Sequence, residues 1–343
     1  MIKALEIELK NRNSEIAESI ETIYFGGGTP SVLNESELMN IMEVIHQKYK
    51  VTPDAELTLE CNPDDIDKSK LEVYKRAGVN RLSIGVQSFR DDDLVLFNRG
   101  HNAAQAESAI KASQDIGLTN ITIDLIYGIP GLDMEAWNQN LDKFILLNLP
   151  HLSAYTLTVE PKTALQHQVK TQELAMPNDE AVINQFKALR TQMMQTGLDH
   201  YEISNFGKPN FHSKHNSNYW KGIPYLGIGP SAHSYDGKKR RWNVANNIQY
   251  IKAIQSGNPY SESEHIDEKT EYNEYILTRL RTKWGLELQR IKDRFNPIIV
   301  AHFETELDKL KKTSYLQIEN NSITLTEEGM TKADGLAAEF FYL

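Results

Sequence analysis

Glycine-rich and polar segments recur along the first 130 residues, each directly after a short run of β-forming residues. The first segment, GGGTP at residues 26–30, follows a run that ends at Phe25. Glycines let the backbone come close to a ligand and expose its amides, while a proline withdraws one donor and restricts φ. Such a loop can hold a carboxylate, a phosphate or the polar end of an amino acid. A tight turn without a ligand explains the same residues equally well.

Further polar residues follow the later runs. Glu60 ends the second run within ECNPDD, Gln87 follows the third within SIGVQSF, Arg99 lies in NRGH, and Asp124 lies in DLIYGIPG. A carboxylate at the end of a strand can accept hydrogen bonds from ribose hydroxyls or an ammonium group. Each of these residues alone is more often a helix cap or a surface charge, so a binding role depends on the whole set.

The segment HNSNYW at residues 215–220 offers a different chemistry. A histidine flanked by two large aromatic residues can ligate haem iron through its imidazole while the rings cover the macrocycle. Taken by themselves, these residues favour a structural histidine whose hydrogen bonds are satisfied.

The elements that must position these residues alternate along the chain. β-rich runs alternate with stretches whose apolar residues recur near the helical period, a pattern typical of parallel βαβ units. We expect strands at residues 21–25, 56–60, 81–86, 120–127 and 151–158, and helices at 36–49, 68–77, 103–116 and 134–147. The chain opens with an expected amphipathic helix at residues 1–18, so no strand precedes the first helix.

The pattern favours an α/β barrel or partial barrel, because candidate ligands recur after the strands, where such barrels gather their active sites. An open doubly wound sheet is the alternative. At the other end of the chain, a winged-helix-like module is expected, with helices at 271–281, 286–295, 299–311 and from 327, and strands at 315–318 and 322–325.

Charge and composition exclude several classes of function. The chain has 343 residues with 37 Lys and Arg against 47 Asp and Glu, a net charge of −10, which opposes binding to nucleic acid. The basic residues 238–241 follow Asp236-Gly237 and are expected to form a solvated turn. No apolar run reaches the roughly 20 residues of a transmembrane helix. The single cysteine, Cys61, excludes an intrachain disulfide, and we expect a cytoplasmic location.

Taken together, GGGTP, ECNPDD, SIGVQSF, NRGH and DLIYGIPG resemble, in order and spacing, successive loops of the radical S-adenosylmethionine proteins of the anaerobic coproporphyrinogen III oxidase group. The resemblance covers essentially the whole chain. It implies a partial (β/α)6 TIM-like barrel at residues 1–160, a middle region at 161–260 and the winged-helix-like module at 261–343. It also implies that S-adenosylmethionine is bound by Gly27, Gly28, Thr29, Glu60, Gln87, Arg99 and Asp124.

The HNSNYW segment and the later YLGIGPSAHS resemble the HemW branch, the haem chaperones, more than the true oxidases. This resemblance implies that His215, Asn216, Tyr219 and Trp220 bind haem or a porphyrin, with His215 as iron ligand, and that haem passes to an unidentified acceptor protein. One alternative is an oxygen-independent coproporphyrinogen III oxidase of porphyrin biosynthesis. Another is a non-catalytic remnant that binds S-adenosylmethionine.

The chain departs from the family at its cluster-binding loop. The family holds a [4Fe–4S] cluster with a Cys-x3-Cys-x2-Cys loop after its first strand, whereas this chain has only Cys61, after a different strand. One segment ahead of Met1 would carry both the absent strand and the absent cysteines, so we expect Met1 to be an internal methionine of a longer protein. As given, the chain is expected to bind no cluster and to be inactive in radical chemistry. A degenerate paralogue with a binding role is the alternative.

Overall fold

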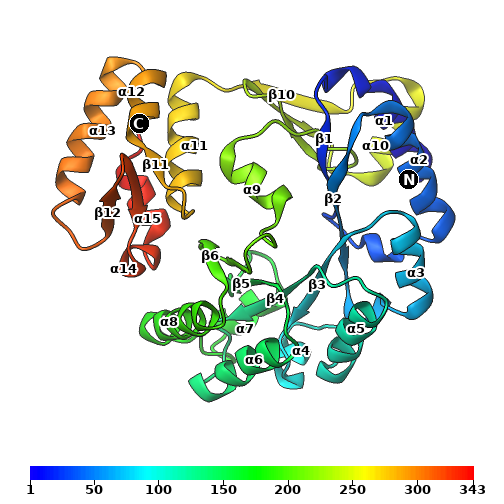
Figure 1. Ribbon diagram of the computed structural model, residues 1–343, viewed down its shortest axis with the longest axis horizontal. Coiled ribbons are helices and arrows are strands. Elements are labelled where there is room, and N and C mark those ends of the chain that lie inside the picture. Colours follow the sequence, from blue (N-terminus) through cyan, green and yellow to red (C-terminus); the bar gives the residue numbers. More distant parts are fainter.

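In the computed structural model, which describes residues 1–343, five parallel strands alternate with helices through the first half of the chain (Figure 1). The strands are β1 (Ile20–Phe25), β2 (Val51–Cys61), β3 (Arg81–Gln87), β4 (Ile121–Tyr127) and β5 (His151–Thr156). The helices between them are α2 (Glu35–Lys48), α3 (Lys68–Arg76), α4 (Asp91–Leu96), α5 (Ala103–Asp115) and α6 (Met134–Leu146). The predicted alternation is confirmed.

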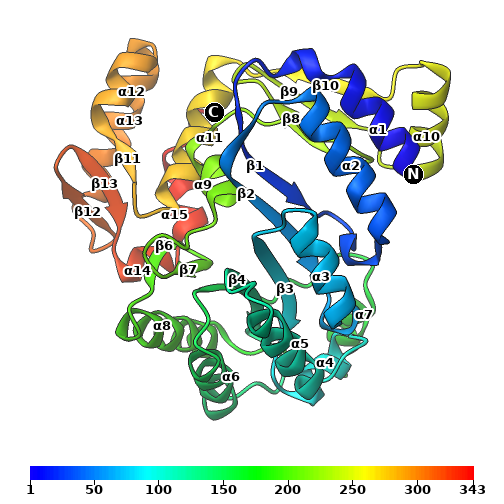
Figure 2. The same ribbon diagram turned by 45° about the vertical axis from the view of Figure 1, so that its right-hand side comes forward.

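Local chemistry explains where these elements begin. The helices α2, α3, α5 and α6 each start at an Asn or Asp whose side chain accepts a hydrogen bond from a backbone amide of the first turn, namely Asn34, Asp67, Asn102 and Asp133. The opening helix, α1 (Ile2–Asn11), is shorter than the expected span of residues 1–18 and is followed by a 3-10 turn at Asn13–Glu15. Figure 2 shows α1 between α2 and α10 (Asn247–Ser256).

The parallel strands belong to a curled seven-stranded sheet with the order β1-β2-β3-β4-β5-β7-β6. After β5 the chain forms α7 (Ala164–Lys170) and α8 (Asp179–Gln195), and then the hairpin of β6 (Asp199–Glu202) and β7 (Asn205–Gly207). β7 pairs antiparallel with β5. The prediction of a partial barrel is therefore confirmed, with an antiparallel hairpin beyond its fifth parallel strand. The sheet extends past residue 160, the expected end of the barrel region.

A second, three-stranded sheet packs beside α1 and α10. It consists of β8 (His233–Tyr235), β9 (Lys239–Asn243) and β10 (Ser261–His265). The prediction that residues 238–241 form a solvated turn was wrong, because the turn stops at Lys238 and β9 begins at Lys239. The strand is held by distant acids, since Arg240 pairs with Glu274 at 2.8 Å and Arg241 with Glu15 at 3.3 Å.

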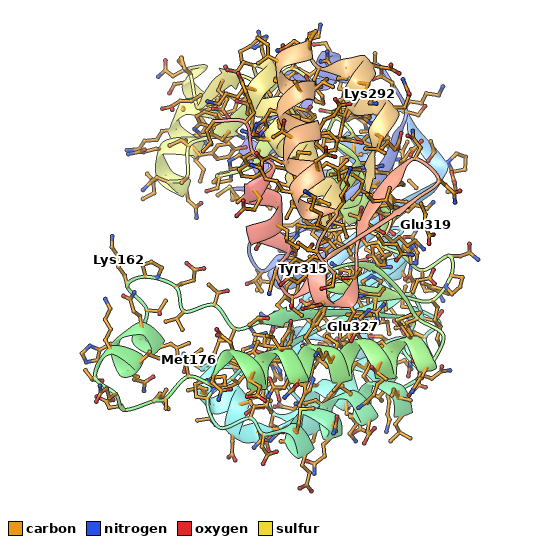
Figure 3. All side chains as sticks on the ribbon, turned by 90° about the vertical axis from the view of Figure 1, so that its left-hand side faces the viewer. Lys162, Met176, Lys292, Tyr315, Glu319 and Glu327 are labelled. Atoms are coloured by element: carbon orange, nitrogen blue, oxygen red, sulfur yellow. The ribbon has the colours of Figure 1, made fainter.

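The C-terminal unit has its own hydrophobic core, which includes Tyr272, Phe303 and Phe340. Its elements follow the order expected for a winged-helix-like module: α11 (Glu268–Leu280), β11 (Leu286–Glu287), α12 (Leu288–Arg294), α13 (Pro297–Leu310), β12 (Leu316–Glu319), β13 (Ser322–Leu325), α14 (Glu327–Met330) and α15 (Ala333–Glu339). In Figure 3, Glu327 lies at the end of this unit that faces α8, where it pairs with Arg190. Across the whole structure, no helix combines the length and apolar character needed to span a bilayer.

Candidate functional site

The glycine-rich loop follows β1 and packs against the end of β2. The Gly27 amide donates to Glu60 Oε2 at 3.2 Å, and the Tyr24 hydroxyl donates to Glu60 Oε1 at 2.7 Å. A Cβ on Gly26 would lie 2.7 Å from Glu60 Oε1, so this close approach requires glycine. Gly27 has a φ of +75°, and space is open beside both Gly27 and Gly28. The loop therefore presents bare backbone to whatever occupies the space beside it.

That space is a cavity of about 180 Å³, which we call the outer pocket. It brings together six of the seven residues that the resemblance assigns to S-adenosylmethionine: Gly28, Thr29, Glu60, Gln87, Arg99 and Asp124. The seventh, Gly27, contacts the pocket's Glu60 through its amide. Residues from five segments thus converge: the loop after β1, the strands β2, β3 and β4, and the connection between α4 and α5. Such convergence is expected where parallel strands share one edge of a sheet. Their individual roles toward a ligand stay predictions.

The outer pocket carries both donors and acceptors. Arg99 Nη2 donates to Asn62 Oδ1 at 2.7 Å and to the Gly85 carbonyl at 3.0 Å, while Arg99 Nε is buried without a partner. Gln87 has a φ of +68°, an uncommon conformation for a residue with a side chain, next to an irregularity in the pairing of β3 with β4. Burial, and next the charge of Glu60, raise the pKa of Asp124 to about 7.

These groups fit S-adenosylmethionine, which offers ribose hydroxyls and an ammonium group to the carboxylates, and acceptor atoms to the unpartnered Nε of Arg99. The residues present do not fit a [4Fe–4S] cluster. Cys61 is the chain's only cysteine, it is buried, and its thiol lies 3.7 Å from the Leu59 carbonyl. Burial raises the pKa of the Cys61 thiol, which disfavours the thiolate that binds iron.

The HNSNYW segment forms α9 (Lys214–Lys221), which lies between the curled sheet and the C-terminal unit (Figure 1). Ser213 is its N-cap and accepts a hydrogen bond from the Asn216 amide at 3.2 Å. The buried carboxylate of Glu56 on β2 accepts from the amides of Lys214 at 3.1 Å and His215 at 3.0 Å. A negative side chain therefore holds the positive end of α9 against the sheet.

His215 points from α9 to β1. Its ring stacks on Tyr24 with centroids 4.6 Å apart, and its Nδ1 lies 3.0 Å from Thr22 Oγ1. Burial lowers the pKa of His215 to about 4, so the imidazole is neutral at physiological pH, as iron ligation requires. The tautomer whose Nδ1–H donates to Thr22 leaves the lone pair on Nε2 for a metal.

The other three residues predicted to contact haem, Asn216, Tyr219 and Trp220, point in different directions. Asn216 lines a second cavity inside the sheet, and Tyr219, which is 42% exposed, meets the His215 ring edge-on at 5.0 Å. Trp220 lies under the guanidinium of Arg281 at 5.6 Å, and its Nε1 is buried without a partner. His215 and Tyr219 are thus adjacent, whereas Trp220 packs toward the C-terminal unit.

The second cavity, which we call the inner cavity, has a volume of about 90 Å³. It connects the predicted S-adenosylmethionine site with the predicted haem site. It shares Glu60, Ser83 and Asp124 with the outer pocket, and Ser213 and Asn216 of α9 also line it.

The residues that sequence reasoning missed include Thr22 and Tyr24, which contact His215, and Thr58 and Arg81, which line the inner cavity. The sequence did carry one signal for Arg81, since this charged residue begins the otherwise largely apolar run RLSIGV.

The comparisons with protein families and with related proteins agree with one another. Residues 6–144 match the radical SAM superfamily, and residues 266–331 match the HemN C-terminal domain. The chain is 33% identical over 331 residues to heme chaperone HemW of Bacillus subtilis, covering 96% of this chain and 87% of that protein. It is 31% identical over 323 residues to heme chaperone HemW of Lactococcus lactis, covering 94% and 85% respectively.

Among solved structures, coproporphyrinogen III oxidase (HemN) from Escherichia coli superposes with a TM-score of 0.85. The superposition covers 99% of this chain and 82% of that one, at 23% sequence identity. At this level of identity the likeness concerns the fold.

Proposed function

Because the chain belongs to the HemW family of radical SAM proteins, we propose that it binds haem and passes it to an acceptor protein. The observation that carries the proposal is the setting of His215, a neutral imidazole held by Thr22 and Tyr24 at the start of α9. The relatives from Bacillus subtilis and Lactococcus lactis are named haem chaperones, which supports binding and delivery over oxidation of a porphyrinogen. A cytoplasmic location is part of the proposal.

Haem binding needs an axial ligand beside an apolar or aromatic surface. His215 supplies the ligand, and the rings of Tyr219 and Tyr225 continue outward from it, with centroids 4.5 Å apart in a T-shaped contact. Because Tyr219 is partly exposed, this aromatic surface is accessible to a macrocycle arriving from solvent. We assign Asn216 and Trp220 only secondary contacts with haem, because Asn216 faces the inner cavity and Trp220 faces the C-terminal unit.

The outer pocket is proposed to bind S-adenosylmethionine. Glu60 and Asp124 would accept hydrogen bonds from its hydroxyl or ammonium groups, while Arg99, Gln87, Thr29 and the amides of the glycine loop would hold its remaining polar atoms. In the family this ligand supplies the adenosyl group for radical chemistry beside the cluster. We assign no such step to this chain, because Cys61 alone does not fit a cluster.

Haem titration of the purified chain tests the proposal. The Soret band of haem should shift and sharpen until one haem is bound per chain, and His215→Ala should abolish or alter this change. His265→Ala is the matched control, because His265 is exposed on β10 and is outside both cavities. Identical spectra and affinities for wild type and His215→Ala would remove the haem site from α9.

Delivery is tested with the haem-loaded chain and a haem-free acceptor such as apomyoglobin. The absorption spectrum of the haem-bound acceptor should appear at a rate that depends on the concentration of haem-loaded chain. Haem that never leaves the chain would contradict the delivery role.

A further inference from the structure

The inner cavity has a buried floor and an open rim. Thr58, Arg81, Thr122 and Ser153 form the floor, and each of them is at least 97% buried. The rim includes the partly exposed Tyr155. A polar cavity of about 90 Å³ has room for several water molecules or for a small polar group with its connecting atoms.

Arg81 is a buried cation without an anionic partner. Its guanidinium is 2% exposed, and its hydrogen bonds all go to neutral oxygens. Nη1 donates to Asn120 Oδ1 at 2.8 Å and to the Phe211 carbonyl at 3.1 Å, and Nη2 donates to Thr122 Oγ1. A buried charge is costly unless an opposite charge and hydrogen bonds compensate it. Glu56 and Asp124 act on Arg81 through space, but no carboxylate forms a hydrogen bond with its guanidinium at the floor of the cavity.

Thr58 is a second unpaired group on the same floor. Its hydroxyl is buried, with the residue 1% exposed, and it has no hydrogen-bond partner. Buried polar side chains are normally hydrogen-bonded, so an orphan hydroxyl that lines a cavity indicates a missing ligand atom. Arg81 can only donate, and a hydroxyl can donate as well as accept, so one acceptor group can bind both residues.

A buried hydrogen-bond chain supports this floor from below. The Tyr201 hydroxyl lies 2.7 Å from His151 Nε2, and His151 Nδ1 lies 3.1 Å from Thr122 Oγ1, which also accepts from Arg81. The Ser213 amide donates to the Tyr201 hydroxyl at 3.3 Å. The orientation of Arg81 is thus set before a ligand arrives, which reduces the entropy lost on binding.

The two acidic residues of the cavity oppose an anion less than two free carboxylates would. Both oxygens of Glu60 already accept hydrogen bonds, from Tyr24 and Gly27. Burial, and next the charge of Glu60, raise the pKa of Asp124 to about 7, so this side chain takes up a proton more readily than an ordinary carboxyl and can then donate. An ammonium ligand, by contrast, would meet the positive charge of Arg81, which no carboxylate bonds directly.

We infer that the inner cavity binds a carboxylate group, which Arg81 and Thr58 hold at the floor beneath α9. Two sources carry this chemistry, a propionate side chain of haem or a free small organic acid. The first source rests on the proposed haem function, because Ser213 and Asn216 of α9 line the same cavity. The second source does not depend on it.

Three probes distinguish these sources: haem, haem dimethyl ester, in which both propionates are uncharged, and sodium propionate. Haem and its ester are titrated by absorbance and propionate by calorimetry. The variants are Arg81→Gln and Thr58→Val, and Arg76→Gln is the matched control, since Arg76 is an exposed arginine paired with Glu35 at 2.6 Å.

If a haem propionate occupies the cavity, wild type and Arg76→Gln should bind haem roughly tenfold to hundredfold more tightly than the ester, as for loss of one charged hydrogen bond. Arg81→Gln should remove that preference, and Thr58→Val should reduce it. If a free acid is the ligand, haem and ester should bind alike, while propionate binds wild type and not Arg81→Gln. Should Arg81→Gln fail to fold, Thr58→Val carries the comparison.

The inference is overturned if the ester binds as well as haem and propionate gives no heat that depends on Arg81 or Thr58. Failure of the proposed function is a separate outcome, in which the chain changes the Soret band of neither haem nor its ester. The propionate titration then still decides whether the cavity holds a carboxylate.

Discussion

Replacing Glu56 by alanine should release the N-terminus of α9 from the sheet. Glu56 is buried on β2, and its two oxygens accept hydrogen bonds from the amides of Lys214 and His215. The substitution removes both acceptors together and leaves two amides at the positive end of a helix without partners. Burial lowers the pKa of Arg81, and the substitution also removes the carboxylate that most opposes this shift.

The size of the effect follows from these contacts. A hydrogen bond to a charged group contributes about 1.5–3 kcal/mol, and loss of an N-terminal cap costs about 1 kcal/mol. Because the two bonds share one carboxylate and are not additive, we expect Glu56→Ala to lower the free energy of unfolding by about 2–4 kcal/mol. Glu56→Gln keeps one acceptor oxygen and should cost about half as much.

Urea denaturation measures the global effect, and hydrogen exchange of the α9 amides measures local release. Asp54→Ala is the matched control, because Asp54 lies on the same strand and reaches the same Lys214 through an exposed ion pair at 3.7 Å. Exposed pairs of this kind contribute little, about 0–1 kcal/mol. If Glu56→Ala unfolds within 0.5 kcal/mol of Asp54→Ala and its α9 amides stay protected, the anchoring role of Glu56 is refuted.

Three further predictions concern the pocket chemistry. Anaerobic reconstitution of the purified chain with iron and sulfide should give no stable [4Fe–4S] absorption or paramagnetic signal, because Cys61 is the only cysteine; a stoichiometric cluster in the monomer would contradict this. Glu60→Ala or Asp124→Ala should weaken binding of S-adenosylmethionine by about 1–3 kcal/mol in equilibrium dialysis, and unchanged affinity in both variants would make these residues structural. The pKa of Asp124 is raised to about 7, so the folded state keeps a proton that the unfolded state loses near pH 4. Stability should therefore fall as pH rises from about 4 to 7, and then level off. In urea denaturation, the free energy of unfolding should be about 2 kcal/mol lower at pH 8 than at pH 5, and this difference should be smaller in Asp124→Asn. Equal pH dependence in the two proteins would show that Asp124 titrates normally.

Local sequence patterns determined the elements and one edge of the sheet. Alternating strands and helices are set by periodicity and by caps such as Asn34, which act over a few residues. Parallel strands bring their carboxyl ends together, so the convergence of Glu60, Arg99 and Asp124 on one pocket was predictable once the strands were placed.

Tertiary structure decided which side chains inside the curled sheet face one another. Thr58 and Arg81 are register partners on β2 and β3, and the inner cavity forms over them where Ser213 and Asn216 of α9 complete the lining. His215 meets Thr22 across 193 positions of sequence. Residues from Lys239 form a strand rather than a turn because their backbone pairs with β8 and with β10, while Glu274 and Glu15, both distant in sequence, pair with the charges of Arg240 and Arg241. A sequence pattern reports contacts within a few residues, whereas burial, ion pairs and cavities depend on segments that only the folded chain brings together.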